Sequence, residues 1–235
     1  MIALANPANR QGRQVADIIS GVARKNKGSL GTAIVRVFKK TAASTGLNER
    51  QLKATGKEYK VVHITANHHA SHFPGAASIY MKMIFDPKTG EIYGAQAVGN
   101  EGVDKRIDIL STAIKGNLNV MDLMELEFTY APPFGSAKDP VNMIGYAATN
   151  IVEGYSDSIQ WYELEEKRNE GAFLLDVREP SEVKRGMIEG FVNIPLNDLR
   201  ERLNEVPKDK TVIVSCQSGQ RSYIAERILR QNGYK

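Results

Sequence analysis

The only cysteine of this 235-residue chain, Cys216, lies where a thiol could act as a nucleophile. It follows the apolar run Val212–Ser215 and opens a short loop before an amphipathic stretch, which predicts a strand, a loop and a helix. Backbone amides and the positive end of a helix converge at such a junction, and both stabilise an anion. The loop and the first helical turn contain only polar or small residues after the cysteine: Gln217, Ser218, Gly219, Gln220, Arg221 and Ser222.

The composition of this loop predicts a cradle for a thiolate. Gly219 lets the backbone turn so that its amides point inward, while Arg221 and Ser222 can close the rim. Such surroundings lower the pKa of a cysteine and make it a nucleophile at neutral pH. We therefore predict that Cys216 and Arg221 are catalytic. The predicted substrate-binding residues are Gln217, Ser218, Gly219, Gln220 and Ser222.

The spacing of Cys216 and Arg221 favours one chemistry over another. Four residues separate them, which gives a small ring of amides suited to the outer sulfur of a persulfide. Cysteine phosphatases use a loop that is one residue longer, because it must surround a phosphate. Sulfur transfer is therefore favoured, and phosphatase activity or an inert buried cysteine remain as alternatives.

Three segments around this loop resemble the rhodanese family. They are LLDVRE at residues 174–179, GFVNIP at 190–195 and VIVS at 212–215, and the resemblance runs from about Gln160 onward. It implies a parallel-sheet α/β domain in which Cys216 carries sulfane sulfur as a persulfide. It also implies that Asp176 and Arg178 support the active loop as an ion pair. Met187 and Phe191 depart from the family pattern, which often has histidine and alanine there.

The end of the sequence leads us to expect an incomplete rhodanese domain. In this family the last strand lies beside the strand that carries the cysteine, and the sequence stops at Lys235 before such a strand. An unpaired edge at that position would destabilise the domain. We also expect a short helix near residues 199–203.

The first two thirds of the sequence have a different pattern. Four β-rich segments at residues 32–38, 59–65, 79–85 and 91–98 predict a mainly antiparallel sheet, and residues 102–115 and 140–152 have helical periodicity. A first helix should start with Asn6 as N-cap and Pro7 in its first turn. The expected fold is a mixed α+β domain with this sheet, followed by a parallel-sheet α/β domain.

Five segments of this part resemble flavin-dependent pyridine nucleotide-disulfide oxidoreductases, in the coenzyme A-disulfide reductase and NADH oxidase branch. They are LANPANRQGR at residues 4–13, ASTGL at 43–47, FPGA at 73–76, GAQAVG at 94–99 and YAPPFGSAKDP at 130–140. The resemblance implies an FAD-binding remnant at 1–26, a dimerisation domain at 27–152, a linker at 153–158 and a rhodanese-like domain at 159–235.

The same resemblance implies cofactors and site residues. Pro7 and Ala8 would contact FAD, while Tyr130 and Phe134 would reach the flavin site of the partner in a homodimer. The complete protein would use FAD and NAD(P)H, with coenzyme A as a ligand and a sulfane-sulfur donor or coenzyme A persulfide or disulfide as substrate. Phe73 and Phe134 replace tyrosines common in the reductases, which leaves persulfide or polysulfide reduction open. We expect no cofactor to be held firmly by this part alone, because the sequence has no dinucleotide-binding glycine motif.

A second interpretation is a dimerisation or interaction module whose rhodanese segment is inactive.

Composition excludes two other classes of protein. The positive charges behind the net charge of +4 are scattered along the sequence, which argues against nucleic-acid binding, and no apolar run approaches the roughly 20 residues of a membrane span. His68, His69 and His72 lack acidic or cysteine partners at ligand spacing, so we expect no metal site. A lone thiol suits a reducing compartment, and we expect a cytoplasmic protein.

Overall fold

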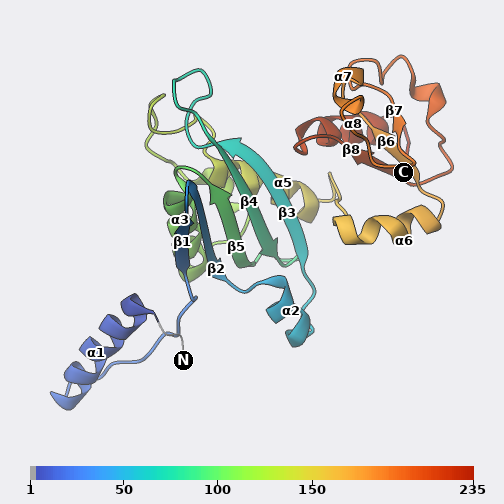
Figure 1. Ribbon diagram of the computed structural model, residues 1–235. Coiled ribbons are helices and arrows are strands. Elements are labelled where there is room, and N and C mark those ends of the chain that lie inside the picture. The colour runs from blue at the N-terminus through green and yellow to red at the C-terminus, as the bar shows by residue number, and fades with distance from the viewer. Residues whose placement is uncertain (1–3) are drawn as a thin grey trace.

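Two separate sheets organise residues 4–235, which are the part of the chain that the computed structural model describes (Figure 1). The first sheet has the order β1-β2-β5-β4-β3, and all its neighbouring strands are antiparallel. Its strands are β1 (Ala33–Val37), β2 (Lys40–Gly46), β3 (Lys60–Asn67), β4 (Ser78–Phe85) and β5 (Ile92–Gly99). The second sheet, β7-β6-β8, is parallel and consists of β6 (Phe173–Asp176), β7 (Val192–Asn193) and β8 (Val212–Ser215). The predicted sequence of a mainly antiparallel domain and a parallel α/β domain is confirmed.

Helices connect and cover these sheets. α1 (Ala5–Ile19) precedes the first sheet. The helices of the first domain are α2 (Glu49–Thr55), α3 (Val103–Lys115), α4 (Asp122–Glu125) and α5 (Pro140–Val152). In the second they are α6 (Leu164–Asn169), α7 (Pro180–Val183) and α8 (Gln220–Gln231), with single 3-10 turns at Trp161–Glu163 and Leu203–Glu205. No helix of the described residues is both long and apolar enough for a membrane span.

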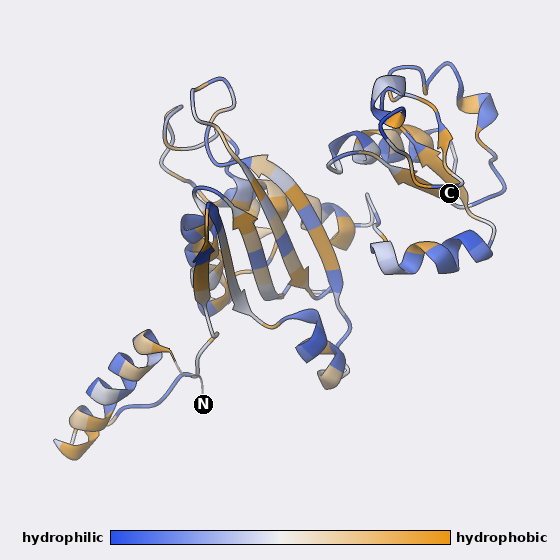
Figure 2. Cartoon of the chain, viewed as in Figure 1, coloured by the Kyte–Doolittle hydropathy of each residue, from blue (hydrophilic) through white to orange (hydrophobic). Residues whose placement is uncertain are grey.

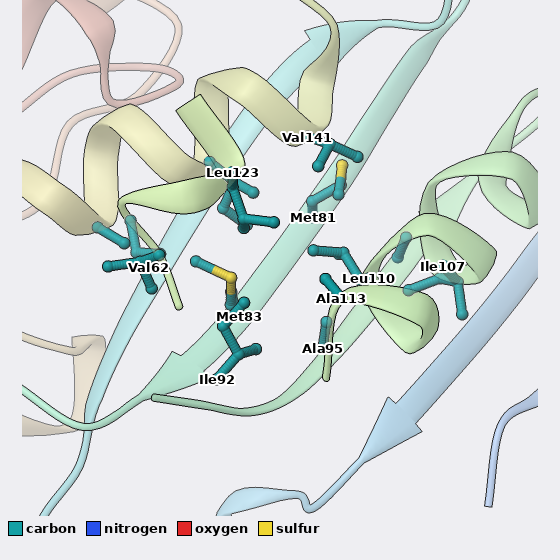
Figure 3. Close-up of a cluster of buried hydrophobic side chains, with 14 of the residues drawn as sticks. Val62, Met81, Met83, Ile92, Ala95, Ile107, Leu110, Ala113, Leu123 and Val141 are labelled. Atoms are coloured by element: carbon teal, nitrogen blue, oxygen red, sulfur yellow. The ribbon is translucent and has the colours of Figure 1, made fainter. Parts of the chain in front are cut away.

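The main core lies between the first sheet and the helices α3 and α5. Alternate residues of β4 point to this side, so that Met81 and Met83 are buried while their neighbour Tyr80 is exposed. Figure 3 shows Met81 and Met83 among side chains from α3, α4 and α5, including Leu110, Leu123 and Val141. Figure 2 shows the same strands as bands of hydrophobic residues. The period-two pattern of the sequence therefore selects which face of the sheet is covered.

The opposite face of the first sheet carries a stripe of mostly apolar residues. Directly paired residues in an antiparallel sheet share a face, and the pairings run from Val35 through Ala42 and Val98 to Tyr80 and Thr65. Tyr80 and Val98 are 55% and 42% exposed. This stripe, which we call the open-face stripe, has no helix over it within residues 4–235.

Two local expectations are wrong. The first helix begins at Ala5 with an extended Leu4 before it, and Asn6 is inside the helix rather than its N-cap. Pro7 is still tolerated there, because amides of the first turn have no intrahelical acceptor. Residues 199–203 form turns instead of a helix, and the 3-10 turn begins only at Leu203.

The two domains are joined by a short segment that α8 contacts directly. Glu226 on α8 accepts hydrogen bonds from the Asp157 amide at 2.9 Å and the Ser156 hydroxyl at 2.5 Å. Tyr223, also on α8, accepts a hydrogen bond from the Asn150 amide group at 3.2 Å. The helix that follows the Cys216 loop is thus fixed to the end of α5.

A buried ion pair holds α3 to the start of α5. Arg106 and Asp139 are almost fully buried, and two nitrogens of the guanidinium donate to the carboxylate at 3.2 and 2.7 Å. The Arg106 guanidinium also donates to the carbonyl oxygens of Gly102 and His68. Asp139 in addition caps α5 by accepting from the Val141 amide at 3.0 Å.

Substitution of Asp139 by asparagine should therefore destabilise the first domain. The amide can still cap α5, but it leaves the Arg106 charge buried without a counter-ion, which costs about 3 kcal/mol. Urea unfolding followed by circular dichroism measures the change in free energy. Asp108→Asn, an exposed substitution in the middle of α3, is the matched control and should change stability by less than about 0.5 kcal/mol. Equal stability of both variants would show that the ion pair contributes nothing.

Candidate active site

Cys216 is held at the junction of β8 and α8. β8 ends at Ser215 and α8 begins at Gln220, so the loop between them consists of residues 216–219. Gly219 has φ +97°, a value that residues with a side chain rarely adopt, and this turns the backbone into the helix. The predicted strand, loop and helix are all present, and the glycine stands where the turn requires it.

The sulfur of Cys216 is surrounded by hydrogen-bond donors. The amide of Gly219 donates to Sγ at 3.2 Å and the amide of Ser222 at 3.3 Å. The hydroxyl oxygen of Ser222 lies 3.5 Å from Sγ, and this hydroxyl donates to the carbonyl of Gly219 at 2.8 Å. Loop and first helical turn together form a cradle around one atom.

These contacts change the acidity of the thiol. Partial burial raises the pKa of Cys216, because it disfavours the thiolate. The hydrogen bond between Sγ and the Ser222 hydroxyl, together with those donated by the amides of Ser218, Ser222 and Gly219, lowers the pKa and outweighs burial. The pKa of Cys216 is therefore below the usual value of a cysteine, as a nucleophile at neutral pH requires.

Arg221 does not donate to the sulfur. Its guanidinium forms two hydrogen bonds to the carboxylate of Glu182 on α7, at 2.6 and 2.7 Å. Both side chains are partly exposed, and the pair joins the first turn of α8 to α7. The positive charge of Arg221 remains near the loop, but an acidic partner balances it.

The remaining groups of the site surround a cavity of about 390 Å³. It is lined by Asp176, Arg178, Gly186, Met187, Ile188, Ser215, Cys216 and Gln217. Asp176 and Arg178 form a two-pronged ion pair with distances of 2.7 to 3.0 Å, and Arg178 also donates to the carbonyl of Gly186. This arrangement fits the supporting role that the sequence suggested for both residues.

The other loop residues differ in their position. Gln217 lines the cavity, whereas the contribution of Ser218 to the sulfur comes from its backbone. Gln220 is exposed in the first position of α8. The sequence did not indicate Ile188, which lines the cavity. It did not indicate Glu182 either, because a partner 39 residues from Arg221 leaves no local signal. The only available clue was the acidic first turn after Pro180.

The four residues expected to contact a flavin fall into two places. The segment that follows α1 is bonded to the end of the sheet at which β2 stops, because the amide of Gly46 donates a hydrogen bond to the carbonyl of Leu30. We call this the Gly46 end of the sheet. The 129–135 segment with Tyr130 and Phe134 is bonded to Ala70, just beyond the opposite end, where β3 stops at Asn67. Pro7 is buried and Ala8 exposed in α1, and both aromatic side chains are exposed.

Residues 32–140 match the family described as pyridine nucleotide-disulphide oxidoreductase, dimerisation domain. Residues 160–235 match the rhodanese-like domain. The chain thus contains a segment that matches an oxidoreductase dimerisation domain, followed by a segment that matches a rhodanese-like domain. Both families predicted from the sequence motifs are confirmed.

Two solved structures match the chain over its whole length, and a curated relative matches part of it. Coenzyme A disulfide reductase of Staphylococcus aureus (strain bovine RF122 / ET3-1) is 43% identical over 148 residues, which cover 63% of this chain and 33% of that protein. Reduced Bacillus anthracis CoADR-RHD is 55% identical, with a TM-score of 0.98 over 100% of this chain. An NAD-dependent persulfide reductase from A. fulgidus is 39% identical, with a TM-score of 0.88 over 100% of this chain. This chain spans 42% of each of these two structures.

Removal of the Ser222 hydroxyl should raise the pKa of Cys216 in the rhodanese-like domain. When Cys216 ionises, the Ser222 hydroxyl can turn from the Gly219 carbonyl to the sulfur, which lies 3.5 Å away. Ser222→Ala removes this donor but keeps the backbone amides, so alkylation should require a higher pH. The rate of iodoacetamide alkylation against pH measures this shift, since only the thiolate reacts. Ser218→Ala is the control, because Ser218 acts through its amide. A higher midpoint in both variants, or in neither, would contradict the role assigned to the hydroxyl.

Proposed function

We propose that the chain is part of a flavin- and NAD(P)H-dependent reductase of disulfides or persulfides, in which Cys216 carries sulfane sulfur. The observation that supports this best is the cradle of amides around a single sulfur, with a lowered pKa. The relatives support it through their printed activities, which are coenzyme A disulfide reduction and persulfide reduction. A module with an inactive rhodanese segment is disfavoured, because the cradle is complete.

The proposed step is attack of the Cys216 thiolate on the outer sulfur of a thiol persulfide, R–S–SH. A bond forms between Sγ and that sulfur, the sulfur–sulfur bond of the donor breaks, and its electron pair leaves on R–S⁻. One thiolate is consumed and one is released, so no outside oxidant or reductant is required. The amides of Gly219 and Ser222 stabilise the charge on sulfur before and after transfer.

The cofactors proposed for the complete protein are FAD and NAD(P)H, with coenzyme A as ligand. A bound flavin would supply the reducing equivalents that split the disulfide or persulfide bond. Pro7 and Ala8 lie on α1 toward the Gly46 end, while Tyr130 and Phe134 lie beyond the opposite end of the sheet. Because Pro7 and Ala8 lie far from Tyr130 and Phe134, each of these two pairs would contact a different flavin molecule. In a homodimer, which would bind two flavins, this arrangement is met.

We further propose the predicted division of the chain, with a flavin-domain remnant at 1–26, a dimerisation domain at 27–152, a linker at 153–158 and a rhodanese-like domain at 159–235. The helix α1 lies apart from the first sheet, and the segment bound by α8 lies between the two domains (Figure 1). A reducing cytoplasm is the compartment that would keep the thiol of Cys216 free.

The persulfide itself can be detected by intact mass. After incubation with a thiol persulfide or polysulfide, the chain should gain one sulfur atom that dithiothreitol removes. Cys216→Ala should gain none, because the acceptor is absent. Wild-type protein that is folded by circular dichroism and gains no sulfur would overturn the proposed function.

We propose that the open-face stripe is the interface of the homodimer, and a substitution in this stripe tests it. Exposed apolar area of this kind marks an interaction surface, and a dimerisation domain gives it a second copy as its partner. Val98→Lys should shift the sedimentation coefficient toward that of a monomer, because it would bury a charge at the interface. Lys184→Glu, an exposed change in the other domain, should leave the coefficient unchanged. A dimer that persists in Val98→Lys would place the interface elsewhere.

A further inference from the structure

The charges around Cys216 cancel in pairs. Arg178, which lines the cavity, is paired with Asp176, and Arg221 at the edge of the loop is paired with Glu182. Two further cations, Lys184 and Arg185, are exposed and lie outside the set of residues that line the cavity. The arginine that lines the cavity and the arginine at the edge of the loop are thus each neutralised by a carboxylate.

Glu182 is fixed from two sides. Its oxygens accept two hydrogen bonds from Arg221, and one of them also accepts from the amide of Glu179 at 3.0 Å. The pKa of Glu182 is lowered to about 2. The main cause is its hydrogen bonding with Arg221, and the hydrogen bond from the Glu179 amide adds to it. The carboxylate therefore stays ionised above that pH, and the neutralisation of Arg221 is constant across any neutral assay range.

The rest of the cavity entrance includes apolar side chains. Met187 and Ile188 are 41% and 49% exposed and line the cavity on the side of the loop that follows α7. A donor that enters the cavity meets these two side chains and paired charges. Such a lining favours a donor with an organic group next to its sulfur over a small, highly charged one.

We propose that Glu182 determines donor specificity: by neutralising Arg221, it makes Cys216 accept sulfur from thiol persulfides in preference to the thiosulfate dianion. This rests on the proposed function, in which Cys216 carries sulfane sulfur. Glu182 is a specificity-determining residue that acts through Arg221 and does not touch the reacting atoms.

The two donors differ in the charge that the site must accept. With thiosulfate, the Cys216 thiolate attacks the outer sulfur, the new sulfur–sulfur bond forms, and the electron pair of the broken bond leaves on sulfite. A dianion thus approaches a thiolate, and a dianion departs. With R–S–SH, a thiolate of single charge departs. An unpaired guanidinium beside the loop stabilises the first reaction more than the second, because the Coulomb energy scales with the charge of the donor.

The test compares both donors on wild-type protein and Glu182→Gln. Thiosulfate and the persulfide of N-acetylcysteamine, whose organic part is uncharged, are the probes, and the second-order rate of sulfur uptake by Cys216 is followed by intact mass. In Glu182→Gln the rate with thiosulfate should rise about fivefold, and the rate with the thiol persulfide should change less than about twofold. Glutamine keeps the size of the side chain and an acceptor for the Glu179 amide.

Two controls separate charge from structure. Glu182→Gln combined with Arg221→Gln should lose the gain with thiosulfate, since the released charge is then absent. Glu189→Gln, an exposed carboxylate in the loop that follows α7, should leave both rates unchanged. Equal changes of both rates in Glu182→Gln, or no change, would overturn the specificity role while Cys216 still takes up sulfur. A wild-type Cys216 that takes up sulfur from neither donor would overturn the proposed function as well.

Discussion

The stabilisation of one partly buried anion is the constraint on which the C-terminal domain depends. A thiolate at the end of β8 loses hydration, and this loss alone would raise the pKa of Cys216. The amides of Gly219 and Ser222 compensate because the backbone turns at Gly219 and the helix starts at once. Strand, turn and helix therefore have to follow one another without a spacer, and the order of elements in this domain reflects that requirement.

Features that depend on neighbours in the sequence could be predicted, and features that depend on distant partners could not. The cradle consists of consecutive residues, so Cys216, Gly219 and Ser222 could be recognised directly, and the apolar alternation of β4 and β5 indicated the first sheet. β2 was missed because its residues are mostly small or polar, and its position depends on pairing with β5. Glu182 was missed for the same reason: only the fold brings it to Arg221.

The dimerisation domain separates two sets of exposed groups. The segment that leads from α1 lies at the Gly46 end of the sheet, and the aromatic segment 129–135 lies beyond the opposite end. The strands between them are held by the core against α3 and α5, with the Arg106–Asp139 pair inside it. A sheet of this kind is a rigid spacer, so strand length fixes the distance between the two ends from which these segments extend.

Helix α8 makes two kinds of contact at once. Its first turn supplies an amide to the sulfur of Cys216, while Tyr223 and Glu226 bind the segment that follows α5. A rhodanese-like domain taken from another protein would therefore need more than an equivalent active loop to replace this one. It would also need a matching outer face on the same helix, so recombination of these two domains is restricted by residues that have no part in sulfur chemistry.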